Sequence, residues 1–220
     1  MTPAQRRAWM CHWERYGVAL QAGETLDLDR LFGRRAPRIL EIGCGMGDAL
    51  LAMAGAAPQQ DYLGIEVYRT GLGSLMQRLV EAERENVRLI NADALEVLPL
   101  LPAAGFDAIL LFFPDPWPKK RHHKRRIVQP VFIRLLASRL KPGGMLHMVT
   151  DWEDYAGHML QVMAQCPEFT NTAGKDSFAP RPDYRPLTRF EQRAHGLGHE
   201  IRELVFIRVG APVATIPGCR

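Results

Sequence analysis

The sequence contains few cysteines, and none of them form a pair at metal-ligand spacing. The four cysteines, Cys11, Cys44, Cys166 and Cys219, are far apart, and no C-x-x-C motif occurs in the 220 residues. Zinc sites and disulfide frameworks depend on such spacing, so neither is predicted. A reducing compartment fits this pattern best, and we expect a cytoplasmic protein.

Long apolar segments are also missing. No apolar run approaches the roughly 20 residues that a membrane-spanning helix needs. Charged side chains at Arg6, Arg7, Glu14 and Arg15 exclude the apolar core of a secretory signal peptide. We therefore expect no membrane partner.

The composition is that of an ordinary globular domain, with 47% hydrophobic and 24% charged residues. No linker divides the chain. We predict a single domain at residues 1–210, in which residues 1–37 form a covering segment, and a flexible tail at residues 211–220.

Positive charge is concentrated in one place. The formal net charge is +4, but residues 119–126 (K-K-R-H-H-K-R-R) alone carry six positive charges, which leaves the rest of the chain near −2. Such a local density suits a polyanion. Before the run, an apolar stretch at 106–113 is ended by the prolines of P-D-P-W-P at 114–118. Asp115 lies at this junction between a predicted strand and the basic run.

A dinucleotide fingerprint is incomplete in this chain. A predicted strand at 38–42 leads into G-C-G-M-G at 43–47 and a helical pattern at 49–57. Strand, glycine turn and helix in this order predict a nucleotide-binding turn. The third glycine of G-x-G-x-x-G would fall at position 48, which is Asp, so a dehydrogenase is disfavoured. The pattern is instead E-x-G-x-G-x-G, beginning at Glu41.

Acidic residues follow the ends of successive predicted strands. These strands are at 61–66, 86–90, 106–113 and 145–150, and the acids are Glu66, Asp93, Asp115 and Asp151. Ligands bind at this edge of an open α/β sheet. Glu66 is placed to accept hydrogen bonds from a ribose diol, although a solvated strand end is the alternative. Asp93 suits an adenine amino group and a helix N-cap equally well.

The remaining elements follow from periodicity. Helices are predicted at about 2–16, 69–85, 125–140 and 152–166, a Pro-rich loop at 174–186, a polar and basic segment at 188–193, and a final strand at 201–209.

Four stretches together resemble the bacterial tRNA (guanine-N7-)-methyltransferases. They are L-E-I-G-C-G-M-G at 40–47, F-F-P-D-P-W-P with its basic run at 112–126, T-D-W at 150–152, and R-P-L-T-R-F-E-Q-R at 185–193. The resemblance covers residues 2–208. It implies a Rossmann-like class I methyltransferase fold, with a mostly parallel seven-stranded sheet flanked by helices and an antiparallel last strand. It also implies methyl transfer from S-adenosyl-L-methionine (SAM) to N7 of guanine 46 in the tRNA variable loop.

The resemblance also assigns roles to residues. By similarity, the cofactor would contact Glu41, Gly43, Gly45, Glu66, Asp93 and Asp115, and Asp115 would be the catalytic acid. The substrate would contact Lys119, Asp151, Thr188, Arg189, Phe190 and Glu191, and the RNA would contact Arg121, His122, His123, Lys124, Arg125 and Arg126. Arg185 and Arg189 are expected to extend the RNA surface. Family members usually carry a basic segment before the position of Thr2, so RNA affinity is expected to be lower here.

The chemistry argues against a general base. Guanine N7 has a lone pair and no proton, so its attack on the sulfonium methyl group needs alignment above all. We therefore expect Asp115 to accept hydrogen bonds from the guanine and to stabilise the growing positive charge.

Three alternatives compete with this function. They are another SAM-dependent nucleic-acid methyltransferase, such as an amino-group methyltransferase, a non-catalytic RNA-binding protein on the same fold, and the disfavoured dehydrogenase. No metal site is predicted, because His122, His123, His195 and His199 lack partners at ligand spacing. Whether the chain is a monomer or a homodimer remains open.

Overall fold

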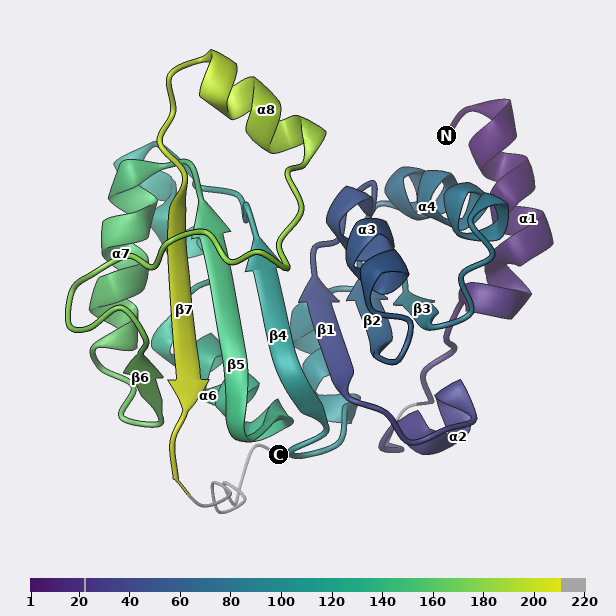
Figure 1. Ribbon diagram of the computed structural model, residues 1–220, viewed down its shortest axis with the longest axis horizontal. Helices are drawn as coiled ribbons and strands as arrows, with labels where there is room; N and C mark the ends of the chain where they lie inside the picture. Colours follow the sequence, from purple (N-terminus) through teal and green to yellow (C-terminus); the bar gives the residue numbers. More distant parts are fainter. Residues whose placement is uncertain (22, 211–220) are drawn as a thin grey trace.

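A seven-stranded sheet forms the centre of the protein in the computed structural model, which describes residues 1–21 and 23–210 (Figure 1). The strands are β1 (Arg38–Ile42), β2 (Asp61–Ile65), β3 (Val87–Ile90), β4 (Phe106–Phe112), β5 (Leu140–Thr150), β6 (Phe169–Asn171) and β7 (Arg202–Arg208). Their order is β3-β2-β1-β4-β5-β7-β6. Strands β1 to β5 are parallel, and β7 is antiparallel to β5 and to β6. The predicted fold class is confirmed.

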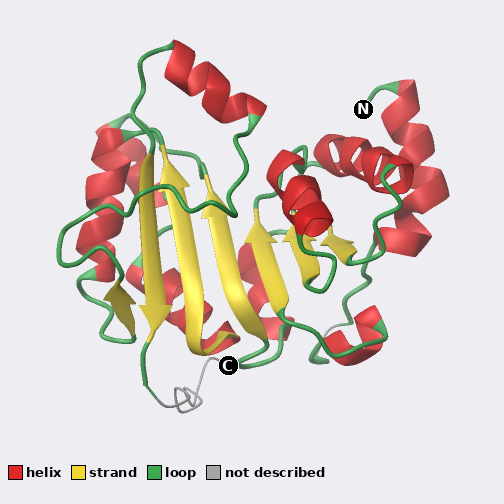
Figure 2. Cartoon of the chain, in the orientation of Figure 1, coloured by secondary structure: helices red, strands yellow, loops and turns green. Residues whose placement is uncertain are grey.

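Helices cover both faces of this sheet, as Figure 2 shows. They are α1 (Pro3–Tyr16), α2 (Leu28–Phe32), α3 (Asp48–Ala56), α4 (Arg69–Glu81), α5 (Ala94–Val97), α6 (Pro130–Arg139), α7 (Glu153–Met163) and α8 (Arg189–Gly196), with 3-10 turns η1 (Leu98–Leu100) and η2 (Lys120–Arg125). All five residues of β1 and of β2 are buried. Coverage on both faces explains why these two strands are buried along their whole length.

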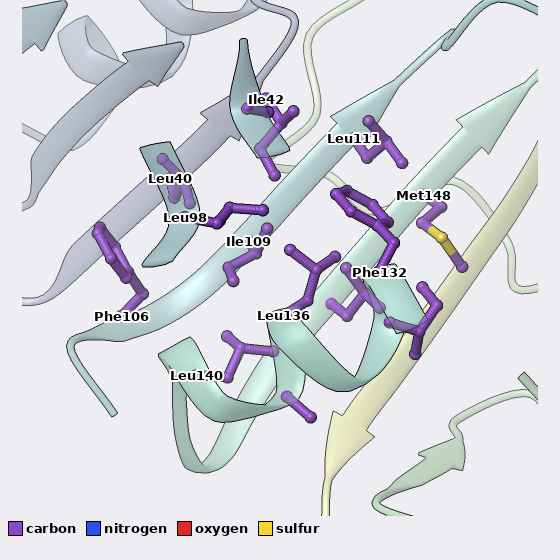
Figure 3. Packing of buried hydrophobic residues seen from close by; sticks show 14 of the residues in the cluster. Leu40, Ile42, Leu98, Phe106, Ile109, Leu111, Phe132, Leu136, Leu140 and Met148 are labelled. Atoms are coloured by element: carbon purple, nitrogen blue, oxygen red, sulfur yellow. The ribbon is translucent and has the colours of Figure 1, made fainter. Parts of the chain in front are cut away.

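Two apolar clusters lie on opposite faces of the sheet. The larger one packs α5, α6 and α7 against the strands and includes Leu40, Ile109 and Leu136 (Figure 3). The other joins α3 and α4 to the opposite face through residues such as Leu50 and Leu75. Helix α1 in turn packs against α4, beside the edge strand β3. The strand ends are thus held between rigid layers.

Several predicted boundaries were wrong. The helix predicted at 125–140 begins only at Pro130, because η2 occupies residues 120–125 and proline suits the first helical turn. Strand β5 begins at Leu140, five residues before the strand predicted at 145–150. The helix predicted at 69–85 ends at Glu81, and the one predicted at 152–166 ends at Met163. Helix α8 and the three-residue strand β6 were missed.

The described residues show three free cysteines, Cys11, Cys44 and Cys166. Within this part of the chain, no helix has the length and apolar character to cross a membrane. Residues 211–220, predicted to form a flexible tail and containing Cys219, lie outside the described residues.

Candidate active site

The turn after β1 has a backbone shape that favours glycine. Gly43, Gly45 and Gly47 have φ angles of 74°, 55° and 73°, in the left-handed region. A Cβ atom on Gly47 would lie 2.5 Å from Leu75, and one on Gly71 of α4 would lie 2.3 Å from the carbonyl oxygen of Gly45. Helix α4 therefore packs directly against the turn at Gly45 and Gly47, whereas a Cβ atom on Gly43 or Gly45 would meet nothing within 4 Å, so space for a ligand remains beside the turn.

Glu66, at the end of β2, holds this turn in place. Its Oε2 accepts a hydrogen bond from the Gly45 N–H at 2.8 Å, and its Oε1 accepts one from the Tyr68 N–H at 2.9 Å. The residue is only 6% exposed. The alternative of a solvated strand end is therefore wrong. Each oxygen keeps a second lone pair, as acceptance from a ribose diol requires.

Glu41, in β1, is a buried carboxyl group without a cationic partner. Its Oε2 has no hydrogen-bond partner among the described residues. Burial, assisted by the nearby charge of Glu66, raises the pKa of Glu41 to about 8. A buried acceptor this close to the glycine turn suits a ligand that brings its own hydrogen-bond donors.

The pKa of Glu41 predicts a pH-dependent stability. The unfolded chain releases this proton near pH 4.5, whereas the folded protein keeps it up to about pH 8. The folded state binds more protons between these values, so the free energy of unfolding falls as pH rises. Relative to Glu41→Gln, the wild type should lose up to about 1.4 kcal/mol per pH unit in this window. Urea unfolding across the window measures this, with the exposed Glu96→Gln as a control; a constant difference would contradict the prediction.

Asp93 caps α5. Its Oδ1 accepts a hydrogen bond from the Leu95 N–H at 2.8 Å. The side chain is exposed and also lines the cavity at the strand ends. The capping role is thus present, and the contact with adenine stays a prediction for the remaining carboxylate oxygen.

The loop that carries Asp115 has a strained backbone on both sides of the acid. Phe113 and Trp117 have φ angles of 51° and 46°, which are uncommon for bulky residues. Such strain is often stored at functional sites. The Phe113 N–H donates to Val149 O at 2.8 Å, and Arg126 Nε donates to Pro116 O at 2.9 Å. These two bonds fix the loop around an exposed Asp115.

Arg126 belongs to the interior. It is 2% exposed, pairs with Asp154, and stacks over the Tyr155 ring with 4.8 Å to the centroid. Its guanidinium therefore cannot reach an RNA phosphate, and its predicted RNA contact is wrong. Within the same run, Arg121, Lys124 and Arg125 are exposed, and His122 and His123 are partly buried.

A cavity of about 390 Å³ brings the strand-end residues together. Five predicted site residues line it: Gly43, Glu66, Asp93 and Asp115 of the predicted cofactor contacts, and Arg125 of the predicted RNA contacts. Trp117 and Arg125 close one side, and the Arg125 guanidinium lies 4.9 Å from the centre of the Trp117 ring. Glu41, Gly45 and the predicted substrate residues lie outside this lining. A more open hollow of about 510 Å³ follows residues 17–31, away from the site.

Helix α8 lies beyond the carboxyl ends of β4 and β5 (Figure 1). The Thr188 hydroxyl caps it by accepting a hydrogen bond from the Glu191 N–H at 3.3 Å. Phe190 contacts Phe113, with ring centroids 4.8 Å apart. This contact brings the 188–190 segment next to the loop, and Arg189 is exposed beside it.

Sequence reasoning did not find a buried polar network below α8. Arg185, 1% exposed, donates to both carboxylate oxygens of Glu191, at 2.6 and 2.7 Å, and to Glu203. Burial would raise the pKa of Glu191, but its bonds to Arg185 outweigh burial and lower it. Glu203 also bonds to His147, which bonds to Tyr184, both at 2.6 Å.

This network changes the expected roles of two residues. Arg185 is enclosed by carboxylates, so the expectation that it extends the RNA surface is wrong. The carboxylate of Glu191 is buried and paired, so a direct substrate contact through it is not available in this conformation.

The other predicted substrate residues are more accessible. Lys119 is exposed, and Asp151, at the end of β5, is partly exposed and lies 3.1 Å from His199 Nδ1. Among the described residues, no group of three or more His, Cys, Asp or Glu could hold a metal ion.

Comparison with known proteins identifies sequence relatives of this chain. Residues 35–204 match a family model described as a putative methyltransferase. The tRNA (guanine-N(7)-)-methyltransferase of Hydrogenovibrio crunogenus is 50% identical over 95% of this chain and 87% of its own length. The enzyme of the same name from Pseudomonas aeruginosa PAO1 is 51% identical over 95% of this chain and 86% of its own length.

Solved structures support the fold independently. The 16S rRNA methyltransferase KamB, 14% identical, superposes with a TM-score of 0.63 over 89% of this chain and all of its own. The aminoglycoside resistance methyltransferase NpmB1, 17% identical, gives 0.55 over 83% of this chain and 92% of its own. At these identities the likeness concerns the fold alone. The sequence relatives show that the chain belongs to the tRNA (guanine-N(7)-)-methyltransferase family.

Proposed function

We propose that the protein transfers the methyl group of SAM to N7 of guanine 46 in the variable loop of tRNA. The observation that carries this proposal is the cavity of about 390 Å³, which Glu66 and Asp115 line together. The exposed cations of η2 begin five residues after Asp115. A cofactor site, an acid and an RNA-binding surface thus adjoin, as the resemblance requires. Action on tRNA would place the protein in the cytoplasm.

The residues around the glycine turn fit SAM. The turn lets a ligand approach the backbone, Glu66 offers acceptor lone pairs for a ribose diol, and Glu41 is a buried acceptor for a donor group. Asp93 adds a carboxylate oxygen on the cavity wall. When bound, SAM supplies an electrophilic methyl group on a sulfonium.

Asp115 faces the cavity and has no ion-pair partner among the described residues. It orients the guanine by accepting hydrogen bonds and stabilises the positive charge that develops as N7 is methylated. No proton has to be removed from N7. Lys119, Asp151, Thr188, Arg189 and Phe190 hold the nucleotide around it, and Glu191 supports them by anchoring α8.

The direct test is methylation of unmodified tRNA with labelled SAM, followed by analysis of the nucleosides. We expect 7-methylguanosine, and a matched tRNA with adenosine at position 46 should remain unlabelled. Label on an exocyclic amino group would indicate an amino-group methyltransferase. No transfer, together with no SAM binding in calorimetry, would indicate an RNA-binding protein without catalysis.

The basic run should bind RNA through phosphates. Arg121 and Lys124 are exposed and form no ion pair within the described residues. The double variant Arg121→Ala/Lys124→Ala should weaken tRNA binding and reduce the slope of log K against log [salt] by about 1.8 for two lost phosphate contacts. The control Arg30→Ala/Arg35→Ala removes the same charge from two exposed residues, one in α2 and one shortly after it, and α2 lies at the opposite end of the strands (Figure 1). An unchanged slope would refute the phosphate role.

A further inference from the structure

A second cationic surface lies on the other side of the cavity, and the proposed function does not account for it. Its members are Arg6, Arg7 and Trp9 of α1 and Arg69 of α4, which we call the α1–α4 surface. Residues 1–13 and 67–80 contain no Asp or Glu. The charge is therefore segregated, because the chain outside residues 119–126 is slightly acidic as a whole.

The cations of this surface are exposed and unpaired. Arg6, Arg7 and Arg69 are exposed, and none forms an ion pair within residues 1–21 and 23–210. The other arginines of the two helices differ, because Arg15 pairs with Glu85 and Arg78 with Asp48. Three guanidinium groups thus remain available to an external anion.

Aromatic packing gives the surface a defined shape. The Arg69 guanidinium lies 5.3 Å from the centre of the Trp9 ring, and Trp9 stacks on Trp13 at 4.1 Å with 14° between the planes. Arg69 Nε donates to Asn91 Oδ1 at 3.0 Å, and Asn91 Nδ2 donates to Glu66 O at 2.8 Å. Arg69 is therefore connected to the strand end that carries Glu66.

Arg69 connects the α1–α4 surface to the cavity. Tyr68, 72% exposed, lines the cavity and directly precedes Arg69. In Figure 1 the N-terminal end of α1 lies at the edge of the sheet toward which β1, β4 and β5 point. The basic run follows β4, whereas Arg69 follows β2. The cavity is therefore flanked by cations on two sides.

We propose that the α1–α4 surface binds the phosphate backbone of the substrate tRNA, on the side of the cavity opposite the basic run. The proposal rests on the proposed function, since that function supplies the RNA. A target nucleotide inside the cavity has backbone on both sides of it, and a single basic run can hold only one of them. Arginines in an acid-free region give the charge complementarity that phosphates need, and Trp9 keeps the Arg69 guanidinium oriented.

The test is equilibrium binding of unmodified tRNA by Arg6→Ala/Arg7→Ala at several salt concentrations. Both side chains are exposed, so the variant should fold. We expect about a threefold to tenfold loss of affinity and a salt slope reduced by up to about 1.8. Arg6→Lys/Arg7→Lys should restore most of the binding, and SAM affinity should be unchanged. The control Arg30→Ala/Arg35→Ala has the same net charge and should bind like the wild type.

The outcomes separate the two proposals. If the wild type methylates tRNA and Arg6→Ala/Arg7→Ala binds no worse than the control, the α1–α4 surface is overturned and the proposed function stands. If the wild type binds tRNA without methylating it and the variant binds more weakly than the control, the surface stands and the proposed function fails. If the wild type binds no tRNA, both are overturned.

Discussion

Asp115→Asn should lower the single-turnover rate of methyl transfer by about 10²-fold or more. The amide keeps the size and one acceptor oxygen but loses the negative charge that faces the cavity. The carboxylate interacts with a positive charge that appears on the purine only during methyl transfer. The variant should therefore show a lower rate at saturating tRNA and SAM. The affinity for tRNA should change little, because the phosphate-binding cations are untouched.

Two controls make this test specific. Asp183→Asn removes a carboxylate from the exposed loop between β6 and α8, without touching the cavity, and should leave the rate unchanged. Asp115→Glu keeps the charge but moves it, and should fall between the wild type and Asp115→Asn. A loss of less than about tenfold in Asp115→Asn would contradict the charge-stabilising role.

Arg185→Ala should cost about 3 to 5 kcal/mol in the free energy of unfolding. The side chain is the shared partner of Glu191 and Glu203, and both carboxylates are buried. Removing the guanidinium takes away the shared buried cation and leaves both buried carboxylates with only weaker or uncharged partners, which is far more costly than losing a surface ion pair. Urea unfolding monitored by circular dichroism measures the effect.

Matched variants separate charge from packing. Arg185→Met/Glu191→Gln/Glu203→Gln removes all three charges and should recover a large part of the stability, because no buried ion is left unpaired. Arg181→Ala removes the more exposed arginine that lies 3.9 Å from Glu191, and should cost less than about 1 kcal/mol. A cost below about 1 kcal/mol for Arg185→Ala would show that water reaches the two carboxylates.

The sequence predicts that Gly43, Glu66, Asp93 and Asp115 meet at one edge of the sheet, and they do line one cavity there, because the signals that place them are local. The glycine turn follows its strand directly, and Glu66 ends the next strand, so order along the chain already implies closeness at the sheet edge. Asp115 is fixed by the prolines that end β4. Strand β6 was not predicted because three residues are too few to show a periodicity. Helix α8 was not predicted because its sequence is mostly polar.

Burial of charge could not be predicted from the sequence. From the sequence, Arg126 is indistinguishable from the other cations of the basic run. Only the structure shows that it points inward, where it pairs with Asp154, 28 residues away. Arg185 and Glu191 sit in a polar segment, and their burial depends on Glu203 in the last strand. Lys and Arg are usually exposed unless they are paired. The expectation that an arginine is exposed therefore fails where a carboxylate far away in the sequence pairs with it.

The polar network below α8 also determines how this part of the molecule opens. Tyr184, His147, Glu203, Arg185 and Glu191 are bonded in series across the loop, β5, β7 and α8. If one member moves away, its buried neighbours lose their hydrogen-bond partners. Opening of this segment one residue at a time is therefore disfavoured. The segment should instead detach in one cooperative step, as a small foldon of its own. The contact between Phe190 and Phe113 would be lost in the same step. Helix α8 should therefore be either fully packed against the Asp115 loop or fully detached from it.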